Sequence, residues 1–323
     1  MEIGSFLELQ MPNGCEYYSQ TMDIARLNTG RNALWHAFRV IGAKAIWIPI
    51  YQCDTVRDTF ISKNVVVKYY HIDSNFNPID IRQEKGDAVL FVNYYGIMSH
   101  QRLSNLTAQY ENVIIDNCQG FFTSPVEGAQ NVYSCRKFVG VPDGSYVIGK
   151  NAHKFVEDYP QGYSSDTARF LLTRIEYGCE GKGYEDRSLN EHRVDSEDIK
   201  KMSKLTYTIL DGTDYRNIIE RRKKNFELAH NLLGSINCIN PKLHYSDDCV
   251  PMVYPLVVEN EELLTKLQQA KHFQGHWWSY ICEEQPDDTF EHWLSRYVIP
   301  ITIDQRYGCE EINYLASIIL NNK

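Results

Sequence analysis

The sequence predicts an α/β protein with a mostly parallel β-sheet and a smaller C-terminal α/β domain. In the first half, short runs rich in β-branched and aromatic residues alternate with helical patterns, an order typical of parallel sheets. Several runs are apolar at consecutive positions, as expected for strands covered on both faces. The 323 residues fit two domains, and we predict a large domain over residues 1–212 and a small one over 213–323.

Each expected element is bounded by turn residues. Strands are expected at Ala45–Ile50, Val65–Ile72, Ala88–Tyr95, Val113–Cys118, Asn131–Cys135 and Ser145–Ile148, with helices at Arg31–Ile41, Asp54–Ser62 and Gln101–Tyr110. From about Pro160 the pattern becomes helical and charged. The stretch Asp211–Asp214 breaks this pattern and provides a good N-cap for a long amphipathic helix ending near Leu233. Beyond it we expect Met252–Val258 and Tyr297–Ile301 to be extended, and helices near Glu261–Phe273 and Glu310–Leu320.

Composition excludes several classes of function. The net charge of −9 argues against binding to a nucleic-acid backbone. The chain has no signal-peptide pattern and no apolar run long enough for a membrane helix, so we expect no membrane association. Nine cysteines without a CxxC pair indicate reduced thiols in the cytoplasm. The histidines form no HExxH motif and no ligand cluster with cysteine, so no metal site is predicted.

The segment from Val113 to Gly149 is the most informative. An apolar run ends in Asp116, and Lys137 follows the next expected strand, beside Ser134 and Arg136. Pyridoxal phosphate (PLP) needs an acid opposite its pyridine nitrogen and an amine for its aldehyde, and this pair provides both. Taken alone, a loop lysine is usually a surface residue and a turn aspartate usually a cap, so the two interpretations stay open at this stage.

A small turn precedes the first expected helix. Thr29 and Gly30 would present free backbone N–H groups to a phosphate, and Arg31 could add positive charge. Simple helix capping explains the same residues.

Together these features resemble the DegT/DnrJ/StrS family of PLP-dependent sugar aminotransferases, which have aminotransferase fold type I. The resemblance extends over most of the chain. It is carried by TGRNAL, similar to the family's phosphate-binding turn, by IWIPIYQC, by VIIDNCQG with its Asp-x-x-Gln motif, by SCRKFVGVPDG with its serine and lysine, and by the C-terminal IPITIDQRYGCEEINYLASII.

The resemblance implies a role for each matching residue. Lys137 would bond to the cofactor and then act as acid and base, Asp116 would pair with the pyridine nitrogen, and Gln119 would meet the phenolic oxygen. Ser134 with Thr29, Gly30 and Arg31 would hold the phosphate. The implied reaction transfers an amino group, usually from glutamate, to a nucleotide-linked keto sugar in surface-polysaccharide or amino-sugar biosynthesis. Members are typically homodimers with sites at the subunit interface.

The chain also departs from the family pattern. Cys53 stands where many members place an aromatic residue against the cofactor ring, and the interface motif Gly-x-Asn-Tyr-Arg is absent from the sequence. These departures favour a second hypothesis, a family member that binds PLP or a sugar nucleotide without transamination. A sugar dehydratase is a third, but the known dehydratase variant has histidine in place of the lysine. The aromatic run Gly275–Tyr280 (GHWWSY) could stack on a sugar, although core packing or a domain interface explains it better.

Overall fold

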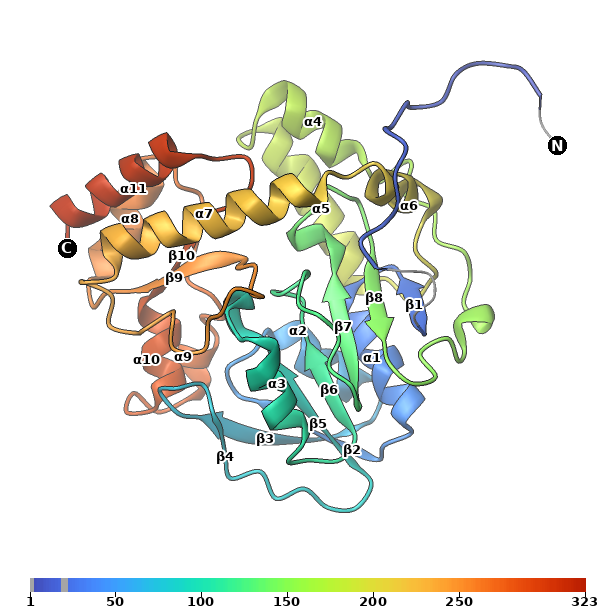
Figure 1. Ribbon diagram of the computed structural model, residues 1–323, viewed down its shortest axis with the longest axis horizontal. Helices are drawn as coiled ribbons and strands as arrows, with labels where there is room; N and C mark the ends of the chain where they lie inside the picture. The colour runs from blue at the N-terminus through green and yellow to red at the C-terminus, as the bar shows by residue number, and fades with distance from the viewer. Residues whose placement is uncertain (1–2, 19–22) are drawn as a thin grey trace.

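The computed structural model describes residues 3–18 and 23–323, and an eight-stranded sheet forms its centre (Figure 1). Across the sheet the strand order is β1-β8-β7-β6-β5-β2-β3-β4. The strands are β1 (Ile24–Leu27), β2 (Ala45–Pro49), β3 (Val66–Ile72), β4 (Pro78–Ile79), β5 (Asp87–Val92), β6 (Val113–Asp116), β7 (Ala129–Ser134) and β8 (Ser145–Ile148). Five central strands, β7-β6-β5-β2-β3, are mutually parallel, whereas β8, β1 and β4 pair antiparallel to their neighbours. The expected mostly parallel sheet is confirmed.

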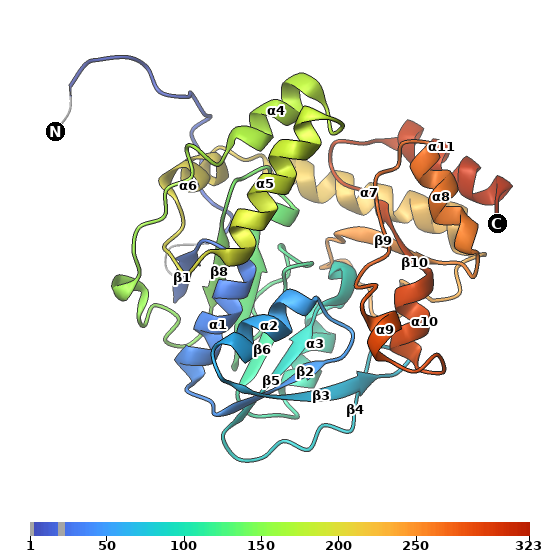
Figure 2. The ribbon, with the colours of Figure 1, turned by 180° about the vertical axis from the view of Figure 1, so that it is seen from behind.

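Helices cover both faces of this sheet. Figure 1 shows α3 (His100–Thr107) in front of the strands, and Figure 2 shows α1 (Gly30–Ile41) and α2 (Asp54–Ser62) in front of the opposite face. Helix α1 packs on β6, β7 and β8. It begins after Thr29, whose hydroxyl accepts a hydrogen bond from the amide of Asn32 at 3.3 Å, and it ends at Gly42, whose φ of 73° favours glycine. The result is a three-layer α/β/α arrangement.

The rest of the chain is mainly helical. After the short turn η3 (Val156–Asp158) come α4 (Arg169–Tyr177), α5 (Lys182–Ser196), α6 (Lys204–Asp211), α7 (Tyr215–Leu233), α8 (Glu261–Gln269), α9 (Ile281–Glu284), α10 (Phe290–Tyr297) and α11 (Cys309–Asn321). Strands β9 (Val253–Val257) and β10 (Val298–Thr302) form a separate antiparallel pair. Helices α7 and α8 pack with α11 beside this pair.

One hydrophobic core joins the large sheet to the C-terminal elements. Phe226 of α7, Leu256 of β9 and Ile301 of β10 belong to the same buried cluster as Ile114 and Val89 of the large sheet. The two-stranded sheet lies entirely within residues 213–323, and the boundary at residue 212 stays a prediction. Within the described ranges, every helix is too short or too polar to cross a lipid bilayer.

Candidate active site

The candidate residues gather at one edge of the large sheet, where parallel strands β6 and β7 end. Asp116 is the last residue of β6 and pairs with Val132, and Ser134 is the last residue of β7. Strand β1, which ends at Leu27, runs in the same direction as β7 because both are antiparallel to β8. The Thr29–Gly30 turn therefore leaves the sheet at this same edge, where ligands bind in sheets of this type.

The Asp116 carboxylate is buried, with 7% of the residue exposed, and the following backbone holds it. Its Oδ1 accepts a hydrogen bond from the amide of Cys118 at 2.9 Å, and the amide of Asn117 donates to the carbonyl of Val132 at 2.7 Å. Burial raises the pKa of the Cys118 thiol and the charge of Asp116 raises it further, so this thiol stays protonated. Within the described residues no lysine or arginine forms an ion pair with Asp116. Its charge is therefore available to a cationic group of a ligand.

Gly30 lies against two parts of this edge. A Cβ added to Gly30 would lie 2.9 Å from Sγ of Cys118 and 3.9 Å from Oγ of Ser134. The turn itself is fixed by Ser145, whose hydroxyl donates to the carbonyl of Thr29 at 2.9 Å. Gly30, at the N-terminus of α1, thus lies beside the hydroxyl of Ser134, and the N–H groups of a helix N-terminus suit an anion such as a phosphate.

Lys137 ends the 3₁₀ turn η2 (Cys135–Lys137), which directly follows β7. Its side chain is exposed, and its Nζ makes no hydrogen bond or ion pair with the residues that the structure describes. Burial raises the pKa of the Cys53 thiol, whereas a hydrogen bond to Thr55 and the charge of Lys137 lower it. The same ammonium lowers the pKa of Cys118 against the larger effect of burial. Lys137 therefore lies within electrostatic reach of both thiols at the sheet edge.

Gln119 presents a fixed hydrogen-bond donor. Its Oε1 accepts a hydrogen bond from the amide of Tyr95 at 2.7 Å, and the residue is 4% exposed. Tyr95 has a left-handed backbone, with φ of 59°, which an aromatic residue adopts only when its surroundings enforce it. The NH₂ group of Gln119 has no partner among the described residues, so it can donate to a ligand oxygen.

Arg31 points to a different partner. Its guanidinium donates to the carbonyl of Val194 and lies 3.3 Å from the carboxylate of Asp195, both at the end of α5. The Arg31 guanidinium is therefore already paired within the protein. Its predicted contact with a phosphate stays a prediction.

A cleft of about 690 Å³ opens beside Lys137. It is bordered by the η2 turn, by helices α4 and α5 and by the segment after β10. The positively charged residues of its lining are Arg136, Lys137, Arg174, Arg187, Arg222 and Arg306, and the negatively charged residues are Glu180, Glu191 and Asp304. Arg136 pairs with Glu191 and Arg306 pairs with Asp304, which leaves a surplus of positive charge in a protein with a net charge of −9.

Arg174 and Arg187 line the cleft but were not predicted from the sequence. Neither residue belongs to a motif, and both lie on helices whose packing brings them to Lys137. Within the described part of the chain, neither guanidinium forms an ion pair. They are thus free to meet an anionic ligand.

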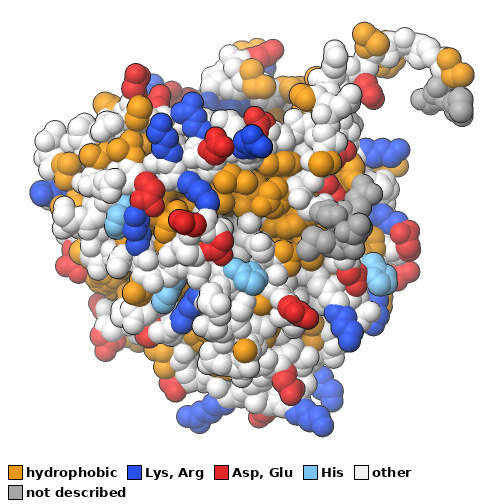
Figure 3. All heavy atoms as spheres, viewed as in Figure 1, with side chains coloured by type: hydrophobic (Ala, Val, Ile, Leu, Met, Phe, Trp, Pro, Cys, Tyr) orange, Lys and Arg blue, Asp and Glu red, His pale blue; other side chains and the backbone are white. Residues whose placement is uncertain are grey.

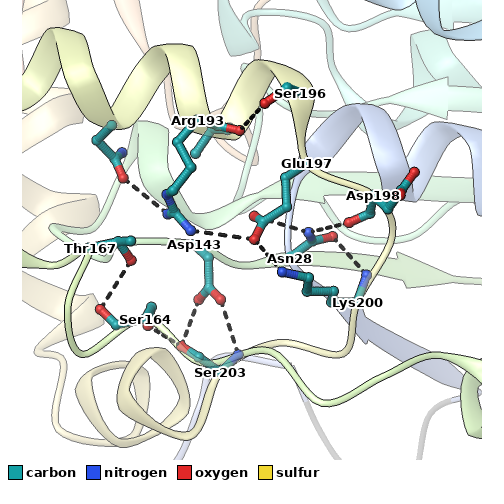
Figure 4. Close-up of polar contacts among 12 residues, drawn as sticks. Asn28, Asp143, Ser164, Thr167, Arg193, Ser196, Glu197, Asp198, Lys200 and Ser203 are labelled. Atoms are coloured by element: carbon teal, nitrogen blue, oxygen red, sulfur yellow. Dashed lines mark hydrogen bonds and ion pairs between the residues drawn. The ribbon is translucent and has the colours of Figure 1, made fainter.

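Asp143 anchors the far end of the loop that carries Lys137 (Figure 4). Its buried carboxylate accepts hydrogen bonds from the hydroxyl and amide of Ser203, at 2.9 and 3.1 Å, and from the hydroxyl of Thr206. Burial raises the pKa of Asp143 against the effect of these hydrogen bonds. Among the described residues Asp143 forms no ion pair, and the three hydrogen-bond donors hold the loop at this point.

Asn28 links this loop to the phosphate turn. Its carbonyl accepts a hydrogen bond from the amide of Gly144 at 2.6 Å, directly after Asp143. Its side-chain NH₂ donates to the carbonyl of Asp198 at 2.9 Å, and its side-chain oxygen accepts from the amide of Lys200 at 3.2 Å (Figure 4). Through Asn28, the linker between α5 and α6 therefore fixes the Thr29–Gly30 turn relative to the loop that carries Lys137.

The aromatic run near residue 277 packs beneath the site. Trp277 stacks on Tyr95 with ring centres 5.5 Å apart, and Trp278 meets Tyr51 edge-on at 4.6 Å. Trp277 and Trp278 are partly buried and pack against the main hydrophobic core, which favours core packing for the run. Cys53 stands where the family pattern predicts an aromatic residue. Its Sγ lies 3.1 Å from Oγ1 of Thr55, and the two groups form a hydrogen bond.

No protein-family model matches the sequence, and no curated protein matches it. Solved structures do match. The sugar aminotransferase CalS13 from Micromonospora echinospora is 14% identical, with 93% of this chain and 88% of that chain covered and a TM-score of 0.65. NtdA from Bacillus subtilis, with bound cofactor PMP, is 13% identical over 92% and 72%, with a TM-score of 0.63. A DegT/DnrJ/EryC1/StrS aminotransferase from Brucella abortus is 11% identical over 92% and 85%, with a TM-score of 0.61. The chain therefore has the fold of these aminotransferases, and the predicted fold class is confirmed.

Proposed function

We propose that this chain is a PLP-dependent aminotransferase of the DegT/DnrJ/StrS family that moves an amino group, from glutamate, to a nucleotide-linked keto sugar. One observation carries the proposal. The candidate residues come from three separate segments of the sequence and lie at one sheet edge. These residues are Thr29 with Gly30, Asp116 with Gln119, and Ser134 with Lys137. The aminotransferases with the same fold, one of them holding PMP, support it.

The free groups at this edge fit the cofactor. The N-terminus of α1 at Gly30 and the hydroxyl of Ser134 would hold the phosphate, and the unpaired carboxylate of Asp116 would face the pyridine nitrogen. The NH₂ group of Gln119 would donate to the phenolic oxygen, and the unpaired Lys137 amine would bond to the aldehyde.

When bound, PLP supplies an electron sink for a carbanion of the substrate. The buried carboxylate of Asp116 would favour a protonated ring nitrogen, because its negative charge stabilises a nearby cation. Nζ of Lys137 would serve as the base that takes a proton from the amino-bearing carbon of the substrate and as the acid that later returns it. Its freedom from other hydrogen bonds suits a group that changes its protonation during each turnover.

The basic cleft beside Lys137 supports an anionic substrate. Arg174 and Arg187 lack acidic partners among the described residues and can pair with phosphate oxygens. A nucleotide diphosphate has such oxygens, and the sugar attached to it would extend toward Lys137. The nine free cysteines suit a reaction in the cytoplasm, and the product would enter surface-polysaccharide or amino-sugar biosynthesis.

The α4–α5 hairpin supports a homodimer. The hairpin exposes Leu172, Ile175 and Leu189, with 82% of Ile175 accessible. Several exposed apolar side chains on one hairpin suit a protein interface. The N-terminal segment also extends away from the body of the molecule and carries hydrophobic side chains (Figure 3). In this segment Ile3, Phe6 and Leu7 are exposed. A second copy that covers the hairpin would also border the cleft, since α4 and α5 form its wall.

The alternative is a protein that binds PLP or a sugar nucleotide without transamination, and Cys53 is the observation that favours it. A thiol gives less stacking area against the ring than an aromatic side chain.

An absorption experiment separates the two functions. Purified protein is mixed with PLP, and its visible spectrum is recorded before and after glutamate is added. We expect a band of covalently bound PLP that glutamate converts to the absorption of PMP. A band that glutamate leaves unchanged supports the alternative. The absence of any band contradicts the aminotransferase and leaves only a protein that binds a sugar nucleotide.

A further inference from the structure

Arg222 of helix α7 is buried beneath the turn that carries Lys137. The residue is 2% exposed, and its guanidinium lies 4.4 Å above the ring centre of Phe138. Its Nη1 donates to the carbonyl of Met252 at 2.9 Å, and its Nη2 contacts the carbonyl of Lys137 at 3.5 Å. Arg222 therefore joins the C-terminal half of the chain to the candidate lysine itself.

Gln305 completes this connection. Its Oε1 accepts a hydrogen bond from Nε of Arg222 at 3.0 Å, and its Nε2 donates to the carbonyl of Phe138 at 2.8 Å. The two carbonyls on the C-terminal side of the turn, those of Lys137 and Phe138, are thus held by two side chains from distant parts of the sequence. Gln305 belongs to the C-terminal segment between β10 and α11.

The burial of Arg222 is energetically costly. Within the described residues it has no ion pair, and burial lowers its pKa to about 10 despite the nearby charge of Asp304. A buried guanidinium without a carboxylate is tolerated only when its N–H groups are hydrogen-bonded, and here backbone carbonyls and Gln305 accept them. An apolar residue would fill the same space at lower cost, so the hydrogen bonds themselves call for an explanation.

We propose that Arg222 and Gln305 are positioning residues for Lys137: together they fix the peptide planes after the lysine and so aim its amine at the sheet edge. The inference rests on the proposed function, because it assigns the reacting amine to Lys137. It predicts that loss of the Gln305 contact loosens residues 135–141 locally and slows the bonding of Lys137 to PLP.

The test compares Gln305→Leu with Gln268→Leu. Gln268 is an exposed residue of α8 whose Nε2 likewise donates to a backbone carbonyl, that of Gln274 at 3.1 Å, but away from the turn. Hydrogen–deuterium exchange of residues 135–141 is measured in both variants, together with the rate at which the visible band appears after PLP is added and the pH at which the band titrates. We expect Gln305→Leu to speed exchange in this segment and to slow the band, each by about tenfold or more, because a buried carbonyl loses its partner.

A second variant separates positioning from packing and charge. Arg222→Lys keeps a positive charge but cannot reach Gln305 and the carbonyl of Lys137 together, so we expect it to behave like Gln305→Leu. If Gln305→Leu does not fold, Gln305→Glu tests the same loss of the donor to Phe138.

Each result decides the inference. Unchanged exchange at residues 135–141, or faster exchange with unchanged band kinetics and unchanged titration, would overturn it. If the wild-type protein forms no band, the proposed function fails, and the exchange rates alone then decide whether Gln305 holds the turn.

Discussion

Gly30 and Cys118 lie against each other in the candidate site, although 87 residues separate them in the sequence. A methyl group on Gly30 would lie 2.9 Å from the Cys118 sulfur, closer than carbon and sulfur normally approach. The backbone of Gly30 is not in the left-handed region, so space rather than φ excludes a side chain here. The contact ties the phosphate turn to the loop after Asp116.

Gly30→Ala therefore creates a steric conflict that a second change can remove. We expect the single variant to lose about 1–3 kcal/mol of unfolding free energy, the range for overpacked sites, and to bind PLP more weakly. Cys118→Ala removes the sulfur, so the double variant should regain much of both losses. Urea unfolding and PLP titration of the four proteins measure this. Equal losses in the single and double variants would contradict the contact.

Lys137→Ala should abolish the visible band that wild-type protein forms with PLP, because no other amine has been assigned to this site. The fold should remain, since the Lys137 side chain is exposed and makes no hydrogen bond among the described residues. Lys154→Ala, at another exposed lysine, serves as the control and should keep the band. Absorption spectroscopy and mass spectrometry after borohydride reduction make the comparison. A band retained in Lys137→Ala would show that a different amine reacts.

Arg174→Ala and Arg187→Ala should weaken binding of a nucleoside diphosphate such as UDP. Each substitution removes a charge-assisted hydrogen bond of roughly 1.5–3 kcal/mol, and the remaining affinity should depend less on salt. Arg82→Ala, at an exposed arginine outside the cleft, is the matched control. Calorimetric titration at two salt concentrations gives the values. An equal effect of Arg82→Ala would exclude the cleft as the phosphate site.

Asp143 gives stability a defined pH dependence. Burial raises its folded-state pKa above the ordinary value of 3.8, so the folded protein binds more protons than the unfolded chain in the pH range just above that value. The contribution of Asp143 to stability is therefore greatest below this range and declines as pH rises through it. Asp143→Asn cannot ionise, so the wild-type advantage over this variant should shrink with rising pH. Urea unfolding at several pH values tests the slope, with exposed Asp166→Asn as the control, and an advantage that grows with pH would contradict the assignment.

Ile175→Glu should convert a wild-type dimer into a monomer, because it places a charge on the apolar face of the α4–α5 hairpin. Ile61→Glu introduces the same change at an exposed isoleucine of α2 and should leave the dimer intact. Sedimentation velocity distinguishes the two states. Dissociation by both variants, or a monomeric wild type, would place the interface elsewhere.

Some elements could be predicted from the sequence because their signals are local. The helix from Tyr215 to Leu233 was expected from the Asp214 cap and the apolar spacing that follows it, and the structure confirms it. Strand β1 was missed because it has only four residues, Ile24–Leu27, with a charged residue among them. The antiparallel placement of β8 against β7 was also beyond the sequence, since strand direction depends on how the chain returns to the sheet.

The sequence alone determined which chemical groups are available: a carboxylate at the end of a buried strand, a lysine after the next strand, and a small turn before a helix. These follow from residue type and hydrophobic pattern, which act over a few positions. Only the tertiary structure decided that these groups share one sheet edge, that Gly30 touches Cys118, and that Arg222 and Gln305 hold the turn of Lys137. Those contacts join residues far apart in the chain, and packing of the whole sheet and its helices sets them.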